Sequence, residues 1–171
     1  MASDGATIRH ATREDVPTIF ALIKELAVYE NALDSVETTE ESLSKTLSFT
    51  TPSAPADFSP GFAKTLLVTA PEGEVCAMAL YFYSYSTWTG PGVYLEDLFV
   101  KPAYRKRGYG KALIKALARE VLRVGGARLE WSCLDWNQPS LDFYEGLGAK
   151  KKVGWYQLRT EGEALKKLAE S

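Results

Sequence analysis

A basic, glycine-containing stretch between an expected strand and an expected helix constrains this chain more than any other feature of its sequence. The run from Val93 to Val100 is apolar and rich in β-formers, and Pro102 should end the strand near Lys101 because proline cannot donate to a sheet ladder. Apolar residues recur at helical spacing after Gly110. The sequence therefore predicts a strand, a short turn and a helix in direct succession.

The turn itself has the composition of an anion site. The first N–H groups of a helix lack partners, the helix dipole is positive there, and glycine lets an anion approach the backbone. Two common phosphate motifs fail, because Ala112 replaces the hydroxyl residue of a Walker A loop and Leu113 replaces a glycine of the dinucleotide fingerprint. A phosphate loop of another kind and a basic turn before an ordinary helix both stay open. The residues in question are Arg105, Lys106, Arg107, Gly108, Tyr109, Gly110 and Lys111.

The bulk properties predict one domain and no membrane segment. A chain of 171 residues suits a single domain, which we assign to residues 1–171. No apolar run approaches the ~20 residues of a membrane span. Residues 1–7 lack the basic start and apolar centre of a signal peptide. We therefore expect a cytoplasmic location and no membrane partner.

Histidine and cysteine are scarce. His10 is the only histidine, so a histidine-activated nucleophile would have to use it, and no histidine cluster exists for zinc. Cys76 and Cys133 lie in apolar, strand-like runs that fit buried thiols better than a disulfide or a metal pair. We expect no metal site and a structural or surface role for His10.

Charge is unevenly distributed along the chain. Residues 1–60 carry ten acids against four bases, whereas residues 101–128 carry nine bases against one acid. The basic segment coincides with the anion turn, and the acidic half suits a cationic second ligand. The basic turn alone could suit nucleic acid, but the overall net charge of −2 argues against such a partner.

The N-terminal half should contain a strand, two helices and a loop. Thr12 and Asp15 have the spacing of a capping box, as do Thr38 and Glu41, so each pair should begin a helix. Three prolines favour a loop between the second helix and the next strand. The expected elements are a strand at Ala6–Ala11, a helix at Arg13–Tyr29, a short helix carrying Leu43 and Leu47, and a loop at Thr50–Gly61.

The remaining elements alternate strands and helices. Pro71–Glu74 and Trp88–Gly92 should connect three successive antiparallel strands, and Gly125-Gly126 should end the helix after the anion turn. These signals predict an α/β fold. In order, the elements are strands at Lys64–Ala70, Val75–Ser84 and Val93–Val100, a helix to Val124, a strand at Arg128–Leu134, a helix at Asn137–Leu147, short strands at Lys150–Val153 and Trp155–Leu158, and a helix at Gly162–Glu170.

Several motifs in this order resemble one known family. They are Tyr83-x-Tyr85-Ser-Thr-Trp88, Tyr94-Leu-Glu-Asp97, Arg105-x-x-Gly108-x-Gly110, Leu134-Asp-Trp-Asn-Gln138 and Phe143-Tyr144. Together they resemble the GNAT superfamily of N-acetyltransferases, and within it the diamine acetyltransferases, whose members act on thialysine or on spermidine and spermine. The resemblance implies the GNAT fold, with a mixed, largely antiparallel central sheet flanked by helices. It also implies acetyl-CoA as the acetyl donor and a homodimer.

Acetyl transfer to an amine requires particular side chains. A lysine-like amine has a pKa of ~10.4, so freeing its lone pair at pH 7 costs ~4.6 kcal/mol, and a nearby carboxylate can accept the proton. The resemblance assigns this role to Glu96, although a solvent-facing acid would satisfy the pattern equally. Strand alternation places Glu96 on one face and Leu95 and Asp97 on the other. For Tyr144, the resemblance implies an acid that protonates the CoA thiolate, and the alternative is a core aromatic.

The resemblance also implies the residues that bind each substrate. The backbone of Leu98, Phe99 and Val100 should pair with the pantetheine arm, the turn Arg105–Lys111 should hold the diphosphate, and Asn137, Ser140 and Tyr144 should line the arm. The alternatives are helix capping for Asn137 and Ser140, packing for the aromatics, a solvated helix end for Glu30 and a structural role for Asp97. The expected acceptor residues are Tyr29, Glu30, Trp88, Glu96, Asp97, Trp136 and Trp155.

Two departures from the polyamine branch concern the acceptor. Ser86 and Thr87 stand where that branch has an acid, and Lys150–Lys152 is basic where relatives are more acidic. Both favour a small amine, such as thialysine, a lysine-like amino acid or a diamine, over a long polycation. With no activated nucleophile visible, we expect direct transfer in a ternary complex. The rival functions are a protein or peptide N-acetyltransferase and a non-catalytic acyl-CoA-binding regulator.

Overall fold

The computed structural model describes residues 5–171 as two compact units that meet in sequence at Ser132 and Cys133, and each unit is described by itself. Residues 1–4 lie outside the described residues. They belong to the N-terminal segment that is predicted not to be a signal peptide. Within the described residues, no helix is long and apolar enough to cross a membrane.

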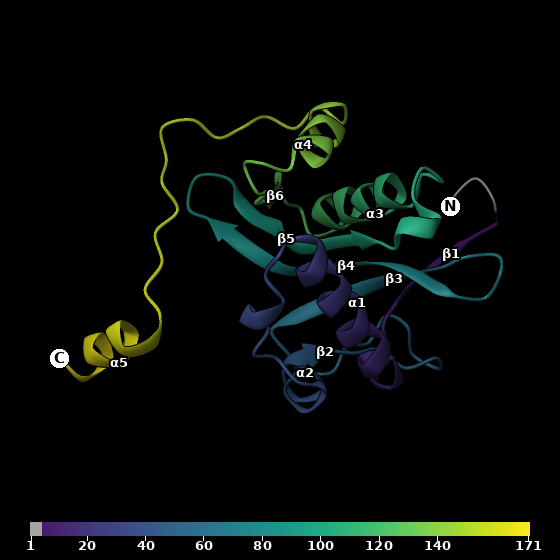
Figure 1. Cartoon of the computed structure of the whole chain (residues 1–171), viewed down its shortest axis with the longest axis horizontal. Coiled ribbons are helices and arrows are strands. Elements are labelled where there is room, and N and C mark those ends of the chain that lie inside the picture. Colours follow the sequence, from purple (N-terminus) through teal and green to yellow (C-terminus); the bar gives the residue numbers. More distant parts are fainter. Residues whose placement is uncertain (1–4) are drawn as a thin grey trace. The chain divides into compact units, whose positions relative to one another are not determined.

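The first unit contains a mixed sheet of six strands, whose arrangement can be followed in Figure 1. Its order is β1-β3-β4-β5-β6, with β2 beside β3; the pairs β2–β3 and β5–β6 are parallel and the others antiparallel. The predicted α/β fold with a largely antiparallel sheet is confirmed. The strands are β1 (Thr7–His10), β2 (Leu47–Ser48), β3 (Ala63–Thr69), β4 (Val75–Ser86), β5 (Gly90–Val100) and β6 (Arg128–Trp131).

The first helix begins as predicted, with one turn of 3-10 helix at Arg13–Asp15 before α1 (Val16–Tyr29). The backbone N–H of Thr12 donates to the Asp15 carboxylate at 2.8 Å, which forms half of the capping box. Arg9 pairs with the same carboxylate at 2.6 Å and so ties the helix start to β1.

The second helix, α2 (Glu40–Thr46), starts one residue later than the predicted pair of Thr38 and Glu41. Thr39 caps it instead, because its hydroxyl accepts from the Ser42 N–H at 3.1 Å while the Ser42 hydroxyl accepts from the Thr39 N–H at 2.9 Å. The expectation that Leu47 belongs to this helix is wrong, since Leu47 pairs with Ala63 as the start of β2.

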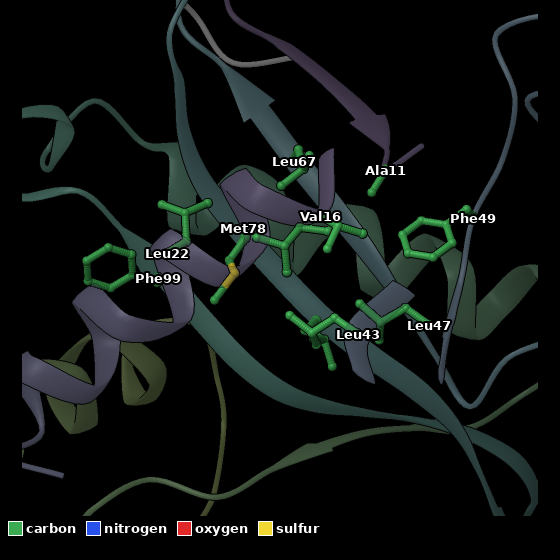
Figure 2. Packing of buried hydrophobic residues seen from close by; sticks show 11 residues of the cluster. Ala11, Val16, Leu22, Leu43, Leu47, Phe49, Leu67, Met78 and Phe99 are labelled. Carbon is green, nitrogen blue, oxygen red and sulfur yellow. The ribbon is translucent and has the colours of Figure 1, made fainter. Parts of the chain in front are cut away.

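Both faces of the sheet are covered. Leu66, Leu67 and Val68 are consecutive in β3 and all buried, so alternation directs them to opposite faces. On one face, α1 and α2 pack over a cluster of apolar side chains that includes Met78 and Phe99 (Figure 2). The amphipathic helix α3 (Tyr109–Arg123) covers β4 and β5 on the other face, where its side chains at 113, 117 and 121 are buried.

A β-bulge interrupts the pairing of β4 with β5. Tyr81 pairs with Leu95, but the next pair is Leu80 with Asp97, so Glu96 has no partner across the ladder. Since Leu80 and Tyr81 point to opposite faces, Leu95 and Asp97 do so as well. The expectation that they share a face is therefore wrong, because it assumed a regular strand.

Strand β6 is shorter than predicted and ends at Trp131 instead of Leu134. Its last pair with β5 joins Trp131 to Leu95, immediately before the bulge. Within residues 5–132, the side of β5 that faces β6 therefore has no ladder partner from Glu96 to Val100.

The second unit contains α4 (Gln138–Glu145) and α5 (Gly162–Glu170), both close to the predicted bounds. The two short strands predicted between them, Lys150–Val153 and Trp155–Leu158, are wrong. This segment runs as an irregular chain (Figure 1). Its residues are exposed. The pattern reflected β-propensity, but a strand also needs a neighbouring strand to pair with.

Candidate active site

The predicted anion turn lies between β5 and α3. After a 3-10 turn at Pro102–Tyr104, Gly108 adopts φ +86° and precedes the first residue of α3. The N–H of Ala112 donates to the Gly108 carbonyl at 2.9 Å and is the first in α3 to bond the backbone in this way. Within the described chain, the N–H groups of Lys106, Gly108 and Gly110 donate to no backbone carbonyl, so they are available to an anion.

Three of the four cations of the turn, Arg105, Lys106 and Arg107, have different surroundings. The Arg105 side chain reaches back to β5, where its Nε donates to the Val100 carbonyl at 3.1 Å, and its guanidinium lies 5.0 Å from the centre of the Tyr29 ring. Arg107 pairs with Glu72 at 2.6 Å. Exposed pairs of this kind are worth at most ~1 kcal/mol, so a diphosphate could compete for Arg107. Lys106 is exposed.

The contribution of the turn between β3 and β4 to the site was not visible in the sequence. Glu74 in this turn accepts from the Lys101 ammonium at 2.7 Å and from the Tyr104 hydroxyl at 2.7 Å. With Glu72 on Arg107, two acids of this turn therefore contact the residues just before the anion loop and one cation within it. Only the turn-forming glycine and proline were visible as a signal in residues 71–74.

Three carboxylates come together where β5 bulges and α1 ends. Glu96 is exposed on the bulge, while Asp97 is half-buried. Burial, and then the negative charges of Glu96 and Glu30, raise the pKa of Asp97 to about 6. Burial also raises the pKa of Glu30, the residue that follows α1. At neutral pH Asp97 is then mostly ionised, so the cluster presents negative charge to a cation.

The open edge of β5 lies between the carboxylates and the anion turn. It includes Leu98, Phe99 and Val100, the three residues expected to pair with pantetheine, and the Phe99 side chain is buried in the α1 face. An extended ligand can add to such an edge through main-chain hydrogen bonds. Because the Arg105 contact already joins Val100 to Tyr29, the described geometry brings the turn, the edge and the end of α1 together.

Trp88 lies apart from this group. It is 81% exposed at the tip of the β4–β5 hairpin, where Ser86 pairs with Gly90. The ladder between that pair and the pair of Leu80 with Asp97 has six steps, or ~20 Å at the usual rise of a strand. Within one chain, the expectation that Trp88 and Asp97 bind the same small acceptor is therefore not supported.

The other predicted residues belong to the second unit. Asn137 is buried and caps α4, where its side-chain oxygen accepts from the Ser140 N–H at 3.4 Å, as the capping alternative expected. Tyr144 is half-buried beside Phe143, with ring centres 5.2 Å apart. Since Glu96 is in the first unit, its pairing with Tyr144 as base and acid stays a prediction.

The two remaining tryptophans, also in the second unit, are exposed. Trp136 is 52% exposed and Trp155 62% exposed. The Lys152 ammonium lies 4.7 Å from the centre of the Trp155 ring. A lysine of the chain therefore already occupies a position on Trp155 that a cationic acceptor would take.

A family model decides how this arrangement is to be understood. Residues 33–149, more than half of the chain, match the model described as the acetyltransferase (GNAT) family. The chain belongs to the GNAT acetyltransferase family. It is therefore an N-acetyltransferase, and the matched region includes the bulge, the open edge, the anion turn and α4.

Sequence relatives of this GNAT protein align with almost its whole length. It is 39% identical to thialysine N-epsilon-acetyltransferase of Bos taurus, over 95% of this chain and 96% of the relative. It is 31% identical to L-ornithine N5-acetyltransferase NATA1 of Arabidopsis thaliana, over 94% and 86%. A solved aminoglycoside N-acetyltransferase, AAC(6')-Iy in complex with CoA, has a TM-score of 0.63 at 21% identity over 91% of this chain and 95% of that one, which supports the GNAT fold.

Proposed function

We propose that this protein transfers the acetyl group of acetyl-CoA to the primary amine of a small molecule, by direct attack in a ternary complex. One observation carries the proposal. The bulge in β5 leaves a free strand edge, Glu96–Val100, with an acidic cluster at one end and an anion-binding turn at the other. A thioester carrier can lie along this edge with its diphosphate on the turn and its acyl group beside the acids.

The residues of the turn fit the donor. The amides of Lys106, Gly108 and Gly110 can bind diphosphate oxygens, and Arg105 and Arg107 can neutralise their charge. The amide groups of pantetheine match the exposed peptide groups of the open edge. CoA is bound by a relative of the same fold, AAC(6')-Iy.

The acceptor end fits an ammonium group. Glu30, Glu96 and Asp97 supply negative charge, and the ring of Tyr29 supplies an aromatic face. The names of two relatives specify an amino nitrogen of a small amino acid, thialysine or ornithine. We therefore propose a thialysine-like, ornithine-like or lysine-like acceptor, with other small diamines next.

The proposed reaction needs a base and an acid. Glu96 takes the ammonium proton, directly or through water, and Asp97 holds the cation beside it. The amine nitrogen then forms a bond to the acetyl carbon, the bond from carbon to sulfur breaks, and Tyr144 gives a proton to the departing thiolate. The nitrogen loses its second proton as the amide forms, and this proton restores the Tyr144 hydroxyl. A covalent acyl-enzyme is not needed. The buried thiol of Cys76, whose pKa burial raises, is also a poor nucleophile.

We further propose that residues 1–171 act as one domain and that the protein is a cytoplasmic homodimer. Support for the dimer comes from the exposed apolar side chains of the C-terminal segment, where Val153, Tyr156 and Leu158 are each about nine-tenths exposed. Light scattering of the purified full chain at assay concentration should give twice the mass of one chain. A monomer under those conditions would contradict this part of the proposal.

A panel of acceptors tests the main proposal. Release of free CoA is measured with thialysine, ornithine, lysine, spermidine and a histone-tail peptide, each at matched concentrations. We expect the first three to be the best substrates. Turnover of the peptide alone would establish the protein N-acetyltransferase instead, and acetyl-CoA binding without turnover of any amine would establish the non-catalytic regulator.

Matched variants separate the proposed roles. Glu96→Gln should lower kcat, whereas Asp97→Asn should mainly raise KM for the amine, because one residue moves the proton and the other holds the cation. Tyr144→Phe should lower kcat and leave the Kd for CoA unchanged. An unaltered kcat for Tyr144→Phe would remove it as the acid.

A further inference from the structure

The last strand of the sheet, β6, carries an arginine and a glutamate side by side. Arg128 and Glu130 are separated by one residue, so strand alternation points both side chains to the same face. A guanidinium nitrogen of Arg128 lies 3.4 Å from a carboxylate oxygen of Glu130, and each side chain is about one-third exposed. This surface therefore presents one positive and one negative charge together.

The strand pairs place these two charges on the face that holds Asp97. Glu130 pairs with Tyr94 of β5, and Tyr94 pairs with Phe82 of β4. Phe82 lies two residues from Leu80, the partner of Asp97, so these side chains all point the same way. Glu130 is therefore displaced from Asp97 by ~7 Å along the strands and ~5 Å across them.

An aromatic surface lies between Asp97 and the charges of β6. The rings of Phe82 and Tyr94 stack with their centres 5.1 Å apart. The hydroxyl groups of Tyr94 and Ser132 are hydrogen-bonded at 2.7 Å, which directs the Tyr94 ring toward β6. Both aromatic residues are half-buried, so part of their surface can contact a ligand. Methylene groups would pack well against such rings.

The order of these groups along the sheet matches the order of groups in an amino acid with a terminal amine. We propose that Arg128 and Glu130 bind the α-carboxylate and the α-ammonium group of the acceptor, and so select free amino acids over diamines. The inference rests on the proposed function, in which Asp97 holds the ammonium group to be acetylated. The methylene groups of the acceptor then lie on Tyr94, its α-carboxylate accepts from Arg128 and its α-ammonium group donates to Glu130.

The charges explain why an amino acid is preferred. An exposed ion pair is weak, so Arg128 and Glu130 can exchange their mutual contact for the opposite charges of a ligand at little cost. A guanidinium binds a carboxylate through two parallel hydrogen bonds. A diamine offers only a second ammonium group, which Glu130 attracts and Arg128 repels.

Matched substrates test the inference on the unmodified protein. Putrescine is ornithine without its carboxylate, and cadaverine is lysine without its carboxylate. Release of CoA is measured for each at saturating acetyl-CoA. We expect kcat/KM for each amino acid to exceed that for its diamine about tenfold, mainly through KM, because a charge-assisted hydrogen bond is lost with the carboxylate. Ornithine amide, which keeps both amines but lacks the negative charge, should behave like putrescine.

Variants assign the selection to the two side chains. Arg128→Gln should raise KM for ornithine about tenfold and should not raise KM for putrescine, with kcat unchanged for both. Continued turnover of putrescine shows that this variant is folded. Glu130→Gln should raise KM for both substrates, because both carry a second ammonium group. Arg119→Gln is the control, since Arg119 is exposed on α3, which covers the opposite face, and it should alter neither KM.

The inference is overturned if the unmodified protein uses putrescine as well as ornithine. It is also overturned if Arg128→Gln leaves KM for ornithine unchanged, or raises KM for ornithine and putrescine alike. In each of these cases a small amine is still acetylated, so the proposed function stands. If no free amine is acetylated, the proposed function fails and the inference fails with it.

Discussion

Replacement of Asp97 by asparagine should stabilise the fold at neutral pH while it weakens binding of the amine. The half-buried carboxyl of Asp97 lies opposite Leu80 on the face covered by α1. Burial, with the nearby charges of Glu96 and Glu30, raises its pKa from 3.8 to about 6. The folded chain therefore holds an ionised carboxylate at neutral pH in a place that disfavours the charge.

The direction and size of the effect follow from proton linkage. Between pH ~4 and pH ~6, the folded chain keeps a proton on Asp97 that the unfolded chain has released. The contribution of Asp97 to the free energy of unfolding therefore falls as the pH rises through this window and is constant above it. Two pKa units correspond to ~3 kcal/mol. Solvent reaches part of the carboxyl, so this is an upper bound.

Chemical denaturation of the protein and of Asp97→Asn at pH 4 and pH 7.5 measures this contribution. At pH 4 the two should differ little, because an asparagine and a largely protonated aspartic acid have the same charge. At pH 7.5 the variant should be more stable by up to ~3 kcal/mol, or ~6–12 °C in melting temperature for a chain of this size. Carboxylates that are distant from Asp97 titrate equally in both proteins and cancel in the difference, whereas Glu96 and Glu30 interact with it.

The neighbouring acid provides the control. Glu96→Gln removes one of the charges that raise the pKa of Asp97. It should therefore narrow the pH range in which Asp97 lowers the free energy of unfolding. Its gain in stability at pH 7.5 should be smaller than the gain from Asp97→Asn. At that pH Asp97→Asn should also raise KM for the amine about tenfold, the value of one charged hydrogen bond. The reasoning is refuted if Asp97→Asn changes stability by the same amount at both pH values.

Three further predictions concern single substitutions at Gly108, Glu120 and Gly61. Gly108→Ala should raise the Kd for CoA and cost ~1–2 kcal/mol of stability, because φ at this position is +86°. The cost comes from the backbone conformation alone, since no atom lies within 4 Å of the added methyl group. An unchanged Kd in calorimetry would contradict this prediction. Glu120, whose pKa the Arg123 hydrogen bond lowers to about 2, adds stability that is lost as the pH falls from ~4.5 to ~2. Glu120→Gln should therefore melt earlier than the unmodified protein at pH 7 and no earlier near pH 2. Gly61→Ala should destabilise the fold by ~1–3 kcal/mol without altering the Kd for CoA, because its Cβ would lie 2.5 Å from the Leu47 carbonyl carbon.

Local sequence signals were sufficient for the scaffold. The helix α3 was predicted because its apolar residues recur every three or four positions, and those at 113, 117 and 121 are indeed buried. Gly108 and Gly125 bound it, as turn-forming residues should. The hairpin between β3 and β4 followed from Pro71–Glu74, where the Gly73 N–H bonds the Ala70 carbonyl at 2.9 Å.

Contacts between distant segments were not predictable in this way. Glu72 and Arg107 are far apart in sequence, and an acid in a turn gives no indication of the cation that it will meet. The same holds for Arg105 and Tyr29, which are joined only because α1 ends beside the end of β5. For the segment Lys150–Leu158, propensity gave two strands, but propensity does not specify a partner.

The bulge at Glu96 is the most consequential feature that the sequence did not reveal, and packing explains why it exists. In a regular strand, Asp97 would share a face with Leu95 and point into the apolar layer beneath α3, where an unpaired charge would cost several kcal/mol. One extra residue in β5 turns Asp97 to the α1 face, where its partner across the ladder is Leu80. The same residue marks the point at which pairing with β6 stops and the free edge begins. Because the acidic cluster and the edge for the donor have one structural cause, a change that removed the bulge would be expected to abolish both binding sites together.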